Sequence, residues 1–172
     1  MKKLSLIFFC IINFSIISHA QLNLKGFNRA MELLYDTTLC NKDGVNVEYR
    51  KYLKKNTKNI NAEVFQVLTD TDTLSFSLVK IYKGSRYDYS IAMLETKDEI
   101  VYEGRGFVKE PCFLAGTFTY ENTANEKKTV PMYWSMPCYD YMALNYLKQF
   151  YETFIEYIGA SSKFDQTTPN PQ

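Results

Sequence analysis

The stretch LSFSLVKIY, residues 74–82, decides the fold class, because its apolar and polar side chains alternate along the chain. Alternation with a period of two is typical of a β-strand that has one face buried and one exposed. The more apolar face carries Leu74, Phe76 and Leu78 with Lys80 at its end, and the other face carries Ser75, Ser77, Val79 and Ile81. The apolar face is expected to be buried. Turn-forming residues flank the stretch at 70–73 and 83–86, which indicates one strand of a series.

Stretches of similar composition, rich in β-branched and aromatic residues, recur between residues 61 and 134. The expected strands are Ala62 to Leu68, Leu74 to Tyr82, Tyr87 to Leu94, Ile100 to Val108, Phe113 to Tyr120 and Val130 to Trp134. The connections between them are too short to hold crossover helices, so consecutive strands should be antiparallel neighbours. The sequence therefore predicts an antiparallel β-meander of 5–6 strands.

Apolar residues at helical spacing lie on both sides of this strand region. A first helix is expected from about Asn23 to Leu39, and a second, short and basic helix should follow it. The cations of this basic stretch gather on one helix face: Arg50, Lys51, Lys54, Lys55 and Lys58. After the strands, an apolar stripe predicts an amphipathic helix from about Tyr139 to Ile158 that packs on the sheet.

These elements predict an α+β domain with one or two N-terminal helices, the meander and the C-terminal helix. In outline alone, a helix on a curved antiparallel sheet resembles the cystatin-like binding folds. The residues themselves identify no family. Because one architecture hosts many functions, this resemblance in outline is weak evidence for the function of the protein.

The first 20 residues have the three parts of a secretory signal. Lys2 and Lys3 begin it, an apolar stretch follows, and Ser18-His19-Ala20 precedes Gln21. Cleavage after Ala20 would leave 152 of the 172 residues, a normal size for one core. We expect a single domain over 21–160 and a disordered tail over 161–172. The protein should be secreted or periplasmic, with no membrane span after processing.

Processing would also change the chemistry of the chain. Removing Lys2 and Lys3 from the 20 basic residues leaves 18 against 19 acidic ones, so nothing favours a nucleic-acid partner. The one histidine, His19, lies in the signal. A domain without imidazole cannot use Ser-His-Asp or Cys-His catalysis or histidine metal sites. We expect a protein that is not an enzyme and holds no cofactor and no metal.

Three cysteines, Cys40, Cys112 and Cys138, follow the expected signal, and no pair has the Cys-x-x-Cys spacing. In an oxidising compartment a pair is expected to bond. A hairpin turn centred near residue 124 would place Cys112 opposite Pro137, beside Cys138. The sequence therefore favours a Cys112–Cys138 disulfide with Cys40 as the free thiol. A Cys40–Cys138 bridge is one alternative, and buried free thiols without any bridge are the main rival.

Tyrosines are abundant, and aromatic side chains suit both sheet packing and binding surfaces. The candidate partner-binding residues are the five cations named above together with Tyr87, Tyr89 and Tyr102. The leading hypothesis is an exported, non-catalytic binding protein that recognises another protein, as a toxin-neutralising protein or an inhibitor does. A carrier of a hydrophobic small molecule is the alternative. A carboxylate-based hydrolase, with a pair such as Glu95 and Asp98 as acid and base, is the third reading.

Overall fold

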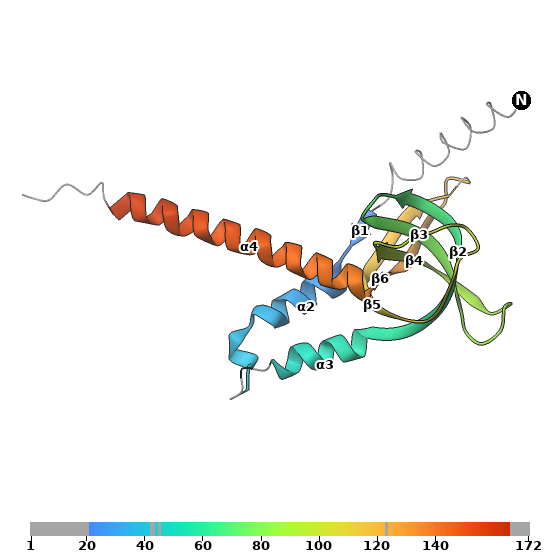
Figure 1. Cartoon of the computed structure of the whole chain (residues 1–172), viewed down its shortest axis with the longest axis horizontal. Helices are drawn as coiled ribbons and strands as arrows, with labels where there is room; N and C mark the ends of the chain where they lie inside the picture. The colour runs from blue at the N-terminus through green and yellow to red at the C-terminus, as the bar shows by residue number, and fades with distance from the viewer. Residues whose placement is uncertain (1–20, 42–43, 45, 123, 166–172) are drawn as a thin grey trace, which may run out of the picture. The chain divides into compact units, whose positions relative to one another are not determined.

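The computed structural model describes residues 21–41, 44, 46–122 and 124–165 (Figure 1). The strands are β1 (Gln21–Asn23), β2 (Thr57–Asp70), β3 (Leu74–Tyr82), β4 (Tyr89–Lys97), β5 (Gly106–Glu121) and β6 (Lys127–Ser135). The helices are α2 (Lys25–Tyr35), α3 (Val47–Asn56) and α4 (Met136–Asp165), with a 3-10 turn over Thr37–Leu39. The chain divides after Tyr139 into two compact units, and the first unit holds the sheet with α2 and α3. The elements make up an α+β fold, as the sequence predicts.

The six strands form one mixed sheet in the order β1-β5-β2-β3-β4-β6, and β6 also pairs with β5. That additional pairing closes the strands β2 to β6 into a ring, while β1 is attached to β5. β4 and β6 run parallel, so the purely antiparallel meander is wrong beyond β4. After β4 the chain crosses the end of the ring and pairs β5 with β2. The result is a small Greek-key barrel rather than the open curved sheet of a cystatin-like fold.

The predicted strand from Ile100 to Val108 is also wrong, because residues 98–105 form the loop that crosses the barrel end. The Arg105 side chain holds this loop: it pairs with Glu99 at 2.5 Å and donates a hydrogen bond to the Ile100 carbonyl. Val101 is buried in the barrel core. The fourth and fifth predicted strands are thus replaced by one loop and one long strand, β5.

The ring closure turns one face of the sheet inward, and small barrels are filled by the side chains of that face. The packed cluster is Ile60, Ala62, Val64, Val79, Ala92, Leu94, Val101, Phe107, Cys112 and Tyr133. Ser75 and Ser77, which share a face of β3 with Val79, are also buried. Their predicted exposure is wrong, because the closed barrel covers a serine face that an open sheet would have left in water.

The outer face of the barrel is covered in part by α2. Phe27 of α2 meets the Trp134 ring edge-on at 4.9 Å, and Tyr139 packs against Phe113 at 4.6 Å. All four rings are buried. Edge-on and tilted arrangements of this kind are the favourable geometries for aromatic pairs. This cluster joins α2, β5, β6 and the first turn of α4 within the first unit.

Asn46 begins α3 and ties it to α2. Its Oδ1 accepts a hydrogen bond from the Tyr49 N–H at 2.8 Å, which caps the helix. Its Nδ2 donates to the Leu33 carbonyl at 2.5 Å and to the Asp36 carbonyl at 3.3 Å. One side chain therefore satisfies backbone groups at the end of α2 and at the start of α3. Figure 1 shows that α3 leads directly into β2.

The C-terminal helix α4 is longer than the sequence predicts. α4 continues through Gly159 to Asp165, past the predicted end at Ile158, because one glycine costs a helix only about 1 kcal/mol. The packing of this helix on the sheet stays a prediction. The secretory signal at 1–20 and residues 166–172 of the expected tail lie outside the described residues.

Candidate functional site

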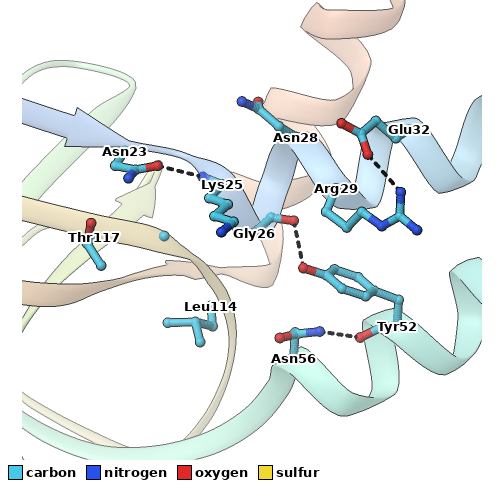
Figure 2. Close-up of a pocket in the computed structure, with 11 residues that line it drawn as sticks. Asn23, Lys25, Gly26, Asn28, Arg29, Glu32, Tyr52, Asn56, Leu114 and Thr117 are labelled. Atoms are coloured by element: carbon cyan, nitrogen blue, oxygen red, sulfur yellow. Dashed lines mark hydrogen bonds and ion pairs between the residues drawn. The ribbon is translucent and has the colours of Figure 1, made fainter.

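An open groove of about 650 Å³ lies in the first unit, where the first turns of α2, the end of α3 and the middle of β5 meet (Figure 2). α2 contributes Lys25 and Arg29, α3 contributes Tyr52 and Asn56, and the strand contributes Leu114 among others. Leu114 is the one wholly aliphatic side chain that lines it. The surface of the groove is nevertheless mostly apolar, because the carbon stems of the long side chains line it.

The course of β5 creates this groove. On one edge, β5 pairs with β2 up to Phe113, opposite Thr57, and with β1 from Thr117, opposite Asn23. Between these two pairings neither β1 nor β2 pairs with residues 114–116, and the start of α2 packs there instead. Gly26 allows this approach, since a β-carbon on it would clash with the Leu114 carbonyl oxygen.

Hydrogen bonds fix the walls of the groove (Figure 2). The Tyr52 hydroxyl donates to the Gly26 carbonyl at 3.2 Å, which joins α3 to α2. The Asn56 amide donates to the Tyr52 carbonyl at 2.9 Å. Arg29 pairs with Glu32 at 2.8 Å, and both side chains are exposed. These contacts give a preformed groove.

The groove lends little support to the carrier or the hydrolase. A carrier needs an enclosed pocket that covers most of its ligand, whereas this groove is open, although its lining is mostly apolar. A hydrolase needs two carboxyl groups placed around the scissile bond. Glu32 is the one carboxylate lining the groove, and it is paired with Arg29.

Four of the five predicted cations lie on α3 itself. Its residues Arg50, Lys51, Lys54 and Lys55 are all exposed. At 100° per residue these cations span about 140° of the helix circumference, on the side away from Tyr52 and Asn56. Lys51 pairs with Glu48 at 2.8 Å. No ion pair among the described residues involves Arg50, Lys54 or Lys55.

The fifth cation lies elsewhere. α3 ends at Asn56, so Lys58 belongs to β2 and not to the helix face. Its ammonium lies over the Tyr133 ring, 4.8 Å from the ring centroid. A cation in this position is attracted by the face of the aromatic ring.

The predicted tyrosines are exposed but not gathered in one place. Tyr87 is 97 % exposed in the turn before β4, and Tyr89 begins β4 with its ring edge-on to Tyr82 at 6.3 Å. Tyr102 lies in the loop that follows the other end of β4. In Figure 1 the turn between β3 and β4 lies apart from α3. The candidate residues thus form separate surfaces rather than one.

The cysteines are free, so the predicted Cys112–Cys138 disulfide is wrong in this structure. The β5–β6 register places Cys112 opposite Ser135, not Pro137, and leaves Cys138 in the first turn of α4. Both thiols are fully buried, and burial raises the pKa of Cys112 to about 12 and that of Cys138 still further. Cys40 is exposed and free, as predicted.

Glu95 lies in a buried environment that the sequence pattern does not predict. Its side chain is 1 % exposed on β4, and neither carboxyl oxygen has a hydrogen-bond partner among the described residues. Burial raises its pKa to about 7, and the facing Trp134 and Cys138 side chains moderate the rise. Asp98, its suggested catalytic partner, is exposed beyond the strand. The one feature of the sequence that could have indicated this burial is the position of Glu95 directly after the apolar run from Ile91 to Leu94.

Comparison with models of known protein families, with curated proteins and with solved structures finds no match. Within the described ranges, no cluster of three or more histidine, cysteine or acidic side chains could hold a metal ion. No helix in the described part of the chain has both the length and the hydropathy for a membrane span. The function must therefore be argued from the surfaces themselves.

Proposed function

We propose that this protein is exported and binds another protein without catalysing a reaction, and that the exposed basic face of α3 contacts an acidic surface of the partner. The observation that carries this proposal is the isolation of the cations on that face. Arg50, Lys54 and Lys55 are exposed and have no acidic partner among the described residues. None of the ten side chains of α3 is fully buried, and the partly buried ones, Tyr49, Tyr52, Leu53 and Asn56, lie away from the basic face.

Helices in proteins gain most of their stability from packing one apolar face, and α3 has no fully buried side chain there. α3 is held instead by polar contacts of its core-side residues. Asn46 caps it, Tyr52 bonds to α2, and the Tyr49 hydroxyl meets that of Tyr139 at 2.8 Å. This arrangement fixes the helix while its whole basic face stays available to a partner.

Charge complementarity is the recognition that such a face offers. The chain as a whole carries a net charge near zero, so the cations of α3 are a local excess and not part of a basic surface. Complementary charges mainly speed association and select the partner, and their effect falls as salt is added. A nucleic-acid binder would be expected to be basic over much more of its surface.

Charge reversal on α3 tests the proposal. The variant Lys54→Glu/Lys55→Glu is compared with Lys83→Glu/Lys127→Glu, which changes the net charge equally at exposed sites outside α3. With poly-L-glutamate as an acidic polypeptide probe at low salt, the α3 variant should bind about tenfold more weakly than the native chain. The control should bind like the native chain. Equal weakening of both variants would overturn the proposal.

Three further measurements examine the partner and the export. Short duplex DNA at the same salt should bind more weakly than poly-L-glutamate; DNA binding of equal strength would mean that the face recognises any polyanion. A secreted protein encoded beside this gene can then be tested by pull-down with the same variants.

For export, the intact mass of the protein recovered outside the cytoplasm should correspond to a start at Gln21. Retention of Met1 there would defeat this part of the proposal.

A further inference from the structure

Glu95 lies at the junction that closes the barrel. β4 and β6 run parallel over a short ladder that pairs Met93 with Met132, Leu94 with Tyr133 and Glu95 with Trp134. By contrast, the antiparallel β3–β4 pairing runs through every residue of both strands. A parallel pair is also slightly less stable per residue than an antiparallel one. The β4–β6 ladder is therefore the weakest seam of the ring.

The compensation available to a charged carboxyl group at this seam is small. Its oxygens and the Trp134 indole nitrogen are buried without a hydrogen-bond partner among the described residues. An ionised carboxylate in such a place carries a large desolvation cost, whereas a neutral carboxyl is tolerated far better. Ionisation of Glu95 must be accompanied either by that cost or by entry of water into the seam.

The groups that face Glu95 do not remove this cost. Trp134 of β6 and the Cys138 thiol of α4 each favour the ionised form, but burial outweighs them and the pKa stays raised to about 7. Phe76, the neighbour on β3, is apolar. The Cys138 thiol is influenced in turn by Cys112 and by the Lys97 ammonium. Both thiols have strongly raised pKa values, so Glu95 is the group in this cluster that titrates near neutral pH.

We propose that protonation of Glu95 is a switch for the β4–β6 seam: the neutral carboxyl keeps the barrel closed, and the ionised carboxylate loosens β4 from β6. In the open form the carboxylate is hydrated. This inference does not depend on the binding function proposed above, because it rests on the barrel and not on α3.

The difference between the pKa values of Glu95 in the closed and open forms sets how strongly pH changes the opening equilibrium. If the hydrated carboxyl returns to its ordinary pKa of 4.5 from about 7, the opening equilibrium constant rises by about 300-fold between pH 4 and pH 9. Opening is thus favoured by rising pH: the logarithm of the opening constant rises between pH 4.5 and 7, and while the open form is the minority its fraction reaches half of the final value near pH 7. A seam that opens rarely at acidic pH becomes open in a larger fraction of molecules above neutral pH.

Trp134 provides the first readout, because it is the one tryptophan in the chain and lies opposite Glu95. The emission of the full chain should move to longer wavelength as pH rises, with a midpoint near 7, as water enters the seam. Glu95→Gln should abolish this transition. If that variant does not fold, Cys138→Ala serves instead, and it should raise the midpoint because the thiol favours the ionised form.

Amide hydrogen exchange provides the second readout. After correction for the intrinsic pH dependence, protection at residues 93–95 and 132–134 should fall between pH 5 and pH 9, while the β2–β3 amides stay protected. A fluorescence midpoint near 4.5, or the same transition in Glu95→Gln, would overturn the proposal. An unchanged midpoint in Cys138→Ala would do so as well. So would a midpoint near 7 with constant protection of the seam, because the carboxyl would then titrate without moving the strands.

Discussion

Gly116 of β5 lies so close to the carbonyl of Asn23 that no β-carbon fits between them. This contact brings the end of β1 and the start of α2 onto β5, beside the groove. The requirement at Gly116 is for space and not for an unusual backbone, since this glycine has no positive φ. The geometry of the groove therefore depends on the absence of one methyl group.

Replacing Gly116 by alanine should destabilise the protein by about 1–3 kcal/mol, because the added methyl pushes Asn23 and β1 off the strand. Gly106 in the same strand is the matched control. The nearest atom to a β-carbon there is the Ala62 carbonyl oxygen at 4.0 Å, so Gly106→Ala should change stability by no more than about 0.5 kcal/mol. Urea unfolding measures both variants. Equal midpoints would contradict the close contact.

The fold could be predicted as far as local patterns reach. β3 has the predicted bounds, Leu74 to Tyr82, because short turns enclose it on both sides. The pairing of β5 with β2 and the parallel β4–β6 seam join residues far apart in sequence, and no local pattern encodes them. Burial of the serine face of β3 follows from that closure. Its exposure was a reasonable inference for an open sheet only.

Removing the Asn46 side chain should weaken both the start of α3 and its link to the end of α2. Asn46→Ala loses the cap on α3 and leaves the Leu33 and Asp36 carbonyls without this donor, which should cost about 2 kcal/mol. Asn46→Asp keeps the capping oxygen but places an acceptor against those carbonyls, so it should also be destabilised. Urea unfolding followed by circular dichroism compares them. If Asn46→Asp equals the native chain, the link to α2 contributes nothing.

Native-state alkylation should distinguish the three described cysteines. Cys40 is exposed and should react quickly, whereas Cys112 and Cys138 should react only after unfolding. Raising the thiol pKa from 9.0 to about 12, as at Cys112, lowers the thiolate fraction near neutral pH by roughly 1000-fold. Peptide mapping after labelling reads each site separately. A disulfide-linked peptide containing Cys112 and Cys138 would contradict the free thiols and restore the bridge predicted from sequence.

One candidate surface follows from a local sequence pattern, and another arises from contacts between residues far apart in the sequence. The basic face of α3 could be predicted because helical periodicity places Arg50, Lys54 and Lys55 together whatever surrounds the helix. The groove could not, since it arises where β5 exchanges one partner strand for another. The burial of Glu95 could not be predicted either, because one carboxylate at the end of an apolar run gives no indication of what lies opposite.

Glu95 should make the stability of the protein fall as pH rises. Below pH 4.5 the carboxyl is protonated in both the folded and the unfolded state, and it has no effect. Between 4.5 and about 7 only the unfolded state ionises, so the free energy of unfolding decreases. Above 7 the loss is complete. A shift of this size corresponds to about 3 kcal/mol.

Glu95→Gln should remove this dependence, because its side chain is uncharged at every pH. Relative to the native chain, the variant should gain about 3 kcal/mol between pH 4 and pH 8, whatever its stability at pH 4. Glu103→Gln is the control, since Glu103 is exposed, and it should follow the native chain at all pH values. Urea unfolding at several pH values gives the comparison. A constant difference between Glu95→Gln and the native chain would show that the buried carboxyl has an ordinary pKa, because only a group whose pKa differs between the two states makes stability depend on pH.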